Sequence, residues 1–172
     1  MIRREKIIFR GTENMPQYWK VYFSMSEIGK EYEILYTDED PQGKGETLIM
    51  SNTEYEYYTN QRFFNEIKEG DEILSIGYGI GLIVPLIKKT GAKLTILEKY
   101  QEVIDLEKNL DSEINIIIND VNDTDFKTVF QNKKFDIIFS DTSEHNQRKN
   151  ELPQLLKKNG KMLFWTHLSV NK

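Results

Sequence analysis

The feature that most constrains the fold is a regular alternation of apolar runs and helical segments after Gly70. Strand-like apolar runs lie at Glu72–Ile76, Lys93–Leu97, Ile114–Ile118, Phe135–Phe139 and Lys161–Trp165. Segments with apolar residues at helical spacing lie between them, at Leu82–Lys89, Gln101–Leu110, Thr124–Gln131 and Gln147–Lys158. Near-continuous apolar strands that alternate with helices are typical of a parallel sheet covered on both faces. The pattern therefore predicts an open, doubly wound α/β fold with five mainly parallel strands.

The first 69 residues follow a different pattern, rich in aromatic and β-branched side chains. It predicts strands separated by turn residues, at Lys6–Arg10, Trp19–Met25, Tyr32–Thr37 and Glu46–Ser51. A helix over Thr53–Lys68 is expected to follow and to end at Gly70. The chain is thus predicted to consist of a β-rich N-terminal extension, residues 1–69, and an α/β core, residues 70–172.

Composition excludes several classes of function. The 172 residues include 23 basic and 28 acidic side chains, for a net charge of −5, which disfavours a nucleic-acid partner. There is no cysteine, so disulfides, thiolate metal sites and cysteine nucleophiles are excluded, and no metal site is predicted. No apolar run approaches the ~20 residues of a membrane-spanning helix. We therefore expect a cytoplasmic protein that has no membrane partner.

The turn after the first core strand is glycine-rich. It reads Ser75-Ile76-Gly77-Tyr78-Gly79-Ile80-Gly81, so the glycines follow a G-x-G-x-G spacing. The dinucleotide fingerprint requires its third glycine at position 82, which is leucine, so a nicotinamide or flavin site is disfavoured. Glycines at this place let the backbone approach a ligand beyond the carboxyl edge of the sheet. The alternative is a strand-to-helix turn that needs glycine for its conformation alone.

Acidic residues follow the next three core strands. Glu98 ends the second strand, 21 positions after Gly77, where a carboxylate can accept hydrogen bonds from a ribose diol. Asp120 ends the third strand and is placed to accept from an adenine amino group. Asp141 ends the fourth, where a carboxylate can orient an amine and accept its proton. The alternatives are a solvated Glu98 and two helix-capping aspartates.

Taken in order, four motifs resemble the core of the class I S-adenosylmethionine-dependent methyltransferases. They are Ile73–Gly81, Thr95–Glu98, Phe135–Asp141 and Leu156–Gly160, and the resemblance covers about residues 46–169. It implies a Rossmann-like methyltransferase core with S-adenosylmethionine as cofactor. The residues that it implies for cofactor binding are Met50, Ser75, Gly77, Tyr78, Gly79, Gly81, Glu98, Lys99, Asp120, Val121 and Asp141.

A finer resemblance concerns the segment before the glycine loop. Met50, Glu54 and Tyr57 lie at a spacing similar to that of the guanidinoacetate N-methyltransferases. This similarity implies that Met50 helps to enclose the cofactor, that Glu54 helps to hold a guanidino acceptor and that Asp141 acts on the acceptor nitrogen. The stretch ending Asp-Thr-Ser-Glu also looks like the aminopropyltransferases (spermidine synthases), in which an aspartate at this place handles the amine. Further residues expected at the acceptor are Tyr57, Trp19 and Thr142, with a core position as the alternative for Trp19.

The chain departs from the family pattern in two ways. Ser75 stands where an acidic residue is usual, and only twelve residues follow Gly160, which predicts a core truncated at its C-terminus. The last strand would then be an exposed edge, for which we expect a partner chain or a second copy. Three functions follow: an N-methyltransferase for a small amine or guanidino compound, an aminopropyltransferase, or a non-catalytic S-adenosylmethionine-binding protein that works with a partner.

Overall fold

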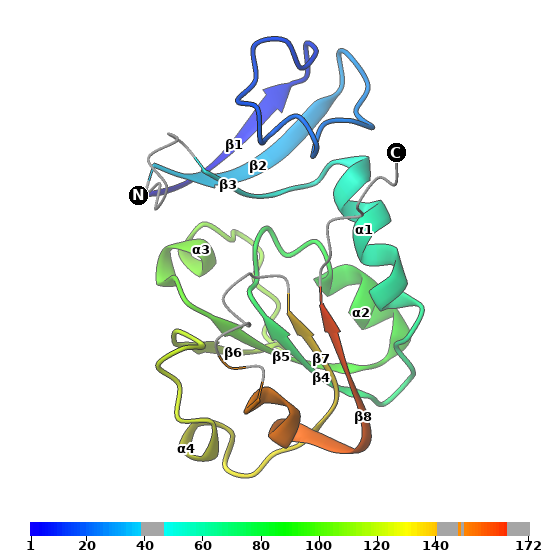
Figure 1. Ribbon diagram of the computed structural model, residues 1–172, viewed down its shortest axis with the longest axis vertical. Coiled ribbons are helices and arrows are strands. Elements are labelled where there is room, and N and C mark those ends of the chain that lie inside the picture. The colour runs from blue at the N-terminus through cyan, green and yellow to red at the C-terminus, as the bar shows by residue number, and fades with distance from the viewer. Residues whose placement is uncertain (39–46, 141–147, 149, 165–172) are drawn as a thin grey trace. The chain divides into compact units, whose positions relative to one another are not determined.

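A computed structural model describes residues 1–38, 47–140, 148 and 150–164 of the chain (Figure 1). The chain divides into two compact units, Met1–Gln61 and Arg62–Lys172. The helix α1, Glu54–Phe64, spans the boundary between them.

The first unit contains a three-stranded antiparallel sheet. Its strands are β1 (Ile2–Ile8), β2 (Glu31–Thr37) and β3 (Thr47–Ser51), with β2 in the centre. β2 and β3 were predicted nearly to the residue, whereas β1 begins earlier than the expected Lys6–Arg10. Tyr32, Ile34 and Tyr36 alternate along β2 and therefore share one face, which is buried.

The strand predicted over Trp19–Met25 is wrong. This segment forms successive turns, in which the N–H of Trp19 donates to the carbonyl of Pro16 and the N–H of Tyr22 to that of Trp19, both at 3.0 Å. Trp19 and Phe23 are both buried, at 7 % and 1 % exposure. Their four-residue spacing suits a helical turn, and the high aromatic content had suggested a strand instead. The two rings complete an aromatic core with Phe9, Tyr32 and Tyr36.

The second unit is built on a five-stranded sheet with the order β6-β5-β4-β7-β8 (Figure 1). Every pair of neighbouring strands is parallel, so the predicted doubly wound fold is confirmed. The strands are β4 (Glu72–Ile76), β5 (Lys93–Glu98), β6 (Asn115–Ile118), β7 (Phe135–Ser140) and β8 (Leu156–Phe164). The helices are α2 (Val84–Thr90), α3 (Gln101–Asp105) and α4 (Phe126–Phe130).

Most helices are shorter than predicted. α1 ends at Phe64 rather than Lys68, and α4 covers Phe126–Phe130 rather than Thr124–Gln131. α3 ends at Asp105 rather than Leu110, and Leu110, expected on its buried face, is exposed. Within the described residues of 147–158, a short 3-10 helix, η1 (Leu152–Leu155), replaces the expected helix, and β8 already begins at Leu156. Leu152 and Leu155 are both buried in the core. Their helical spacing is therefore explained by a single buried turn and does not require a long helix.

Burial on both faces explains why the strands of this sheet are almost wholly apolar. Ile73 and Leu74 point to opposite faces of β4, and both are completely buried. Leu74, Leu97 and Ile138 belong to one core cluster, which also contains Phe130 and Phe135. No helix among the described residues is long and apolar enough to span a membrane.

Candidate functional site

The strand order reverses at β4, which lies between β5 and β7. Ligands of open α/β sheets bind beyond the carboxyl ends of the strands at such a point. Gly77 follows β4, Glu98 ends β5 and Asp120 follows β6, and the parallel pairing brings these three ends to the same edge of the sheet. The predicted candidates Gly77, Glu98 and Asp120 therefore lie at the same edge.

The glycine loop is held in a conformation that only glycine adopts readily. Gly77, Gly79 and Gly81 have φ angles of 94°, 59° and 71°. The N–H of Gly77 donates to the carbonyl of Leu97 on β5 at 2.9 Å. A Cβ atom on Gly81 would lie 2.6 Å from the hydroxyl oxygen of Tyr78. The loop is thus fixed both by its conformation and by its neighbours.

Glu98 ties this loop to β5. Its side chain is only 5 % exposed, and its two oxygens accept different backbone N–H groups. Oε2 accepts from Tyr78 at 2.8 Å, and Oε1 accepts from Tyr100 at 2.9 Å. Since each carboxylate oxygen can accept more than one hydrogen bond, both retain acceptor capacity toward a diol. Glu98 therefore shapes the loop through both oxygens of its carboxylate.

Ser75 and Tyr78 support the loop from within. Ser75 is completely buried, and its hydroxyl donates to the carbonyl of Gly77 at 3.1 Å. Tyr78 is also buried, and its hydroxyl donates to Glu107 Oε2 at 3.3 Å. In both residues the side-chain polar atom is directed to the protein, and the carbonyl of Tyr78 accepts the N–H of Gly81 at 3.0 Å, so these contacts build the loop from within.

Asp120 lies in a turn after β6. Oδ1 accepts the N–H of Asn122 at 2.8 Å, and Oδ2 lies 3.0 Å from Lys99 Nζ. Partial burial alone would raise the pKa of Asp120, but the hydrogen bonds from Asn122 and Lys99 hold it below its ordinary value. Asp120 is thus an ionised acceptor at neutral pH. Val121, also predicted at the cofactor, places its side chain in the core.

The remaining candidates of the first unit have varied surroundings. Met50 is buried on β3, and Trp19 is buried in the aromatic core. Tyr57 is 46 % exposed. Glu54 accepts from Tyr32 at 2.8 Å and pairs with Lys30; burial opposes ionisation, but these bonds lower its pKa below the ordinary value.

Two predicted residues, Asp141 and Thr142, lie outside the described residues.

One buried carboxylate, that of Glu56, was not identified from the sequence. Glu56 on α1 is only 3 % exposed, whereas Glu54, which the family pattern had singled out, is partly exposed. Glu56, Asn60 and Phe63 follow one another at i, i+4 and i+7 and therefore share one face of α1. All three are buried. The signal that could have identified Glu56 is this shared spacing with the apolar Phe63.

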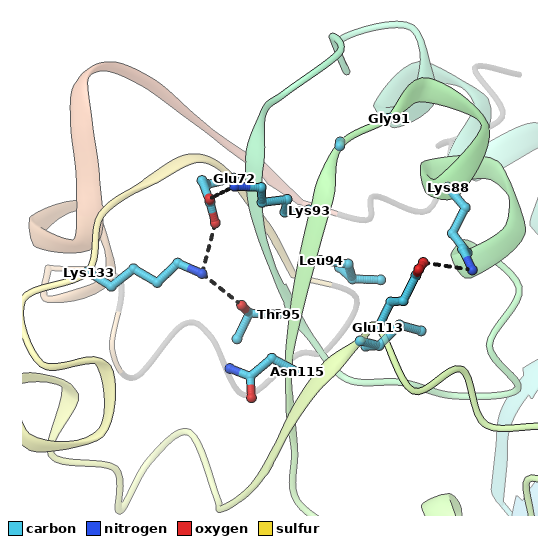
Figure 2. A pocket seen from close by; sticks show the side chains of 11 residues that line it. Glu72, Lys88, Gly91, Lys93, Leu94, Thr95, Glu113, Asn115 and Lys133 are labelled. Carbon is cyan, nitrogen blue, oxygen red and sulfur yellow. Dashed lines mark hydrogen bonds and ion pairs between the residues drawn. The ribbon is translucent and has the colours of Figure 1, made fainter.

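A separate hollow of about 600 Å³ lies at the opposite, amino-terminal edge of β4 and β5 (Figure 2). Its polar lining is dominated by ion pairs. Lys133 Nζ lies 2.8 Å from Glu72 Oε2 and 3.3 Å from the Thr95 hydroxyl, and Lys93 Nζ lies 3.4 Å from Glu72 Oε1. The hydrogen bond from Lys133 lowers the pKa of Glu72.

The lysines of this hollow are all paired. On its other side Lys88 lies 3.3 Å from Glu113 and pairs with Asp111, which is not a lining residue, so each of the three lining lysines already has a carboxylate partner. A set of lysines that are already paired favours no charged ligand. The carboxyl edge, with its glycine loop and acceptors, is therefore the better candidate site. Among the described residues, no group of three or more His, Cys, Asp or Glu side chains could hold a metal ion.

No protein-family model and no curated protein sequence matches the chain. Solved structures do match. One is a chain of the complex between the Haloferax volcanii Trm112 methyltransferase activator and a methyltransferase, with 17 % identity, a TM-score of 0.52, and coverage of 63 % of this chain and 51 % of that chain. A TehB-like SAM-dependent methyltransferase from Corynebacterium glutamicum has 19 % identity, a TM-score of 0.50, and coverage of 62 % and 60 %. YjhP from E. coli has 18 % identity, a TM-score of 0.50, and coverage of 87 % and 55 %.

These similarities establish the fold. The chain has the fold of class I S-adenosylmethionine-dependent methyltransferases, as the motif resemblance implied. It spans between 51 % and 60 % of the length of these three structures. A fold of this kind serves many reactions, so the reaction must be argued from the site.

Proposed function

We propose that this chain is a transferase that binds S-adenosylmethionine and methylates the nitrogen of a small amine or guanidino compound. The observation that carries the proposal is the position of Glu98, buried at the switch point against the glycine loop. A buried carboxylate whose oxygens each accept one backbone N–H, beside a loop of three left-handed glycines, suits a ribose diol.

The donor and acceptor set fits the rest of the nucleoside. Asp120 supplies an ionised acceptor at the end of the neighbouring strand, in reach of an adenine amino group bound over β5 and β6. Lys99 occupies one oxygen of Asp120, so the incoming amino group must share that oxygen or use the one that faces Asn122. Gly77 and Gly79 carry no side chain that would keep a ligand from the backbone.

When bound, S-adenosylmethionine supplies an electrophilic methyl group on a sulfonium. The chain's task is then alignment, because an in-line displacement needs the acceptor nitrogen at near-attack distance behind the methyl carbon. We assign the acceptor's proton to Asp141, which follows β7, the neighbour of the central strand β4, in sequence. A carboxylate that accepts this proton contributes ~10²–10⁴-fold to the rate.

The acceptor contacts are proposed on the same basis. Glu54 would bind a cationic acceptor by exchanging the Lys30 ammonium for the acceptor's own cation, since Lys30 already shows that this carboxylate takes one. Tyr57 offers an exposed ring, and Met50 and Thr142 complete the proposed set, whereas Trp19 is buried in the aromatic core and is not proposed to contact the acceptor.

We also propose a partner chain or second copy at β8. Among the described strands β8 borders β7 alone, and one structure with this fold is a complex with an activator protein.

The test is a product analysis. The purified protein is incubated with S-adenosylmethionine and a panel of small amines and guanidino compounds, and the nucleoside product is identified by mass. Release of S-adenosylhomocysteine with a methylated acceptor supports the proposal. Release of methylthioadenosine instead identifies an aminopropyltransferase, and tight binding without any turnover identifies a non-catalytic cofactor-binding protein.

A further inference from the structure

The backbone of the turn that carries Asp120 accepts hydrogen bonds from a side chain that is distant in sequence. Arg148, which lies after β7 in the chain, donates from Nη1 to the carbonyl of Val121 at 3.2 Å and to that of Asn122 at 2.6 Å. Its Nη2 donates to the carbonyl of Thr124 at 3.0 Å. Three carbonyls of one turn thus share a single guanidinium.

The guanidinium is itself fixed in place. Its Cζ lies 4.5 Å from the ring centroid of Phe126, and its Nη2 lies 2.7 Å from Glu151 Oε2. The side chain is only 15 % exposed. A planar fork that stacks on a ring and donates from two nitrogens is a geometry that arginine provides and lysine does not.

The hydrogen bonds of Arg148 are linked to Asp120 through a single peptide unit. The carbonyl of Val121 and the N–H of Asn122 belong to the same planar peptide group. A hydrogen bond that orients the Val121 carbonyl therefore also orients the Asn122 N–H. That N–H is the donor to Asp120 Oδ1 at 2.8 Å. The turn is closed further by the Thr124 hydroxyl, which donates to the backbone carbonyl of Asp120 at 2.5 Å. Arg148 is thus connected to the Asp120 carboxylate through the Val121–Asn122 peptide group.

We infer that Arg148 is a positioning residue for the nucleoside site: it holds the turn after β6 so that Asp120 presents its carboxylate at the carboxyl edge. The functional half of this inference rests on the proposed function, since it needs an adenine for Asp120 to bind. The structural half, that Arg148 orders the turn, stands by itself. The two halves are tested by separate measurements.

The first measurement is binding. Calorimetric titration with S-adenosylhomocysteine compares the wild type with Arg148→Ala and Arg148→Lys. Loss of charge-assisted hydrogen bonds should weaken the affinity of both variants by about tenfold or more. Millimolar guanidinium ion should restore part of the affinity to Arg148→Ala but not to Arg148→Lys, whose ammonium fills the site. Unchanged affinity, or a loss that guanidinium does not rescue, overturns the inference.

The second measurement needs no ligand. Hydrogen–deuterium exchange of the wild type should show protected amides over residues 121–125, and Arg148→Ala should lose that protection and regain part of it with guanidinium. Arg10→Ala is the matched control: it removes an exposed arginine of the first unit and should change affinity less than about twofold.

The outcomes separate the two ideas. A wild type that does not bind S-adenosylhomocysteine contradicts the proposed function, and the exchange measurement then still decides whether Arg148 orders the turn. Equal exchange in the wild type and Arg148→Ala overturns the role of Arg148, whatever the wild type binds.

Discussion

Glu98 Oε2 accepts the backbone N–H of Tyr78 at 2.8 Å, so the last residue of β5 holds the loop that follows β4. The same carboxylate accepts the N–H of Tyr100 through Oε1 at 2.9 Å. A residue expected to face a ligand therefore also builds the surface on which that ligand would lie. We therefore expect ligand affinity and local stability to be coupled at this position.

Substitution of Glu98 should affect both properties. Glu98→Gln replaces one acceptor oxygen by an NH₂ group, which would face a backbone N–H, and Glu98→Ala removes both acceptors. Each variant should lose about 1–3 kcal/mol of unfolding free energy and bind S-adenosylhomocysteine at least about tenfold more weakly. Urea denaturation and calorimetry measure the two effects. Glu102→Gln, at an exposed position of α3, is the control, and a Glu98→Gln variant with wild-type affinity would remove Glu98 from the binding site.

Gly81→Ala should be more destabilising than Gly70→Ala. Both glycines have left-handed backbones, with φ of 71° and 80°, so both substitutions incur the ~1–2 kcal/mol conformational cost of that region. Only at Gly81 would the new Cβ meet a neighbour, the Tyr78 ring, whereas nothing lies within 4 Å at Gly70. The difference in denaturation midpoint between the two variants measures the steric part. Equal midpoints would mean that the ring moves aside freely.

The sequence predicted the fold best where local and tertiary preferences agree. The strands β4, β5 and β7 appeared as uninterrupted apolar runs because both faces of the sheet are covered. The prediction failed for Trp19–Met25, since aromatic side chains indicate burial but not the conformation that achieves it. It also lengthened α3, because Leu110 fits the helical spacing and yet is exposed.

The site was predictable as a set of positions but not as a set of contacts. Parallel strands that end at one edge bring Gly77, Glu98 and Asp120 together, and that follows from topology. The contacts join residues that are distant in sequence. Glu98 accepts from the backbone of Tyr78, 20 positions away, and Arg148 donates to carbonyls of the turn after β6, which lie 24–27 positions away. Such pairings depend on how loops pack, which no local pattern encodes.

Asp136 should make stability depend on acidic pH. Burial opposes its ionisation, but the Glu72 N–H at 2.8 Å and Lys157 Nζ at 2.6 Å hold its pKa below the ordinary value. A carboxyl whose pKa is lowered by folding stabilises the fold above its unfolded pKa, ~4, and loses that contribution as the pH falls through the folded value. Asp136→Asn should therefore lower the free energy of unfolding at pH 6, and the difference in this free energy between the variant and the wild type should shrink toward pH 2.

Urea midpoints recorded from pH 6 to pH 2 test this expectation. Asp123→Asn, at an exposed position, serves as the control and should run parallel to the wild type. If Asp136→Asn also runs parallel to the wild type across this range, the contacts of Asp136 do not contribute to acid stability.

Asp141→Asn should abolish turnover while leaving nucleoside affinity within about threefold, because the amide cannot accept the acceptor's proton. The expected loss of rate is at least ~10²-fold. Initial rates and calorimetry on the same preparation separate the two quantities. A variant that unfolds, or one that keeps its rate, would show that Asp141 has a structural role or none.

The central claim is that a sulfonium nucleoside binds between the glycine loop and Glu98. Isothermal titration of the purified protein with S-adenosylmethionine and S-adenosylhomocysteine tests it most directly, with Glu98→Ala titrated in parallel. Saturable binding of both ligands by the wild type, weakened at least about tenfold in Glu98→Ala, is the predicted result. An absence of binding heat with either ligand, or equal affinity in the two proteins, would contradict the account.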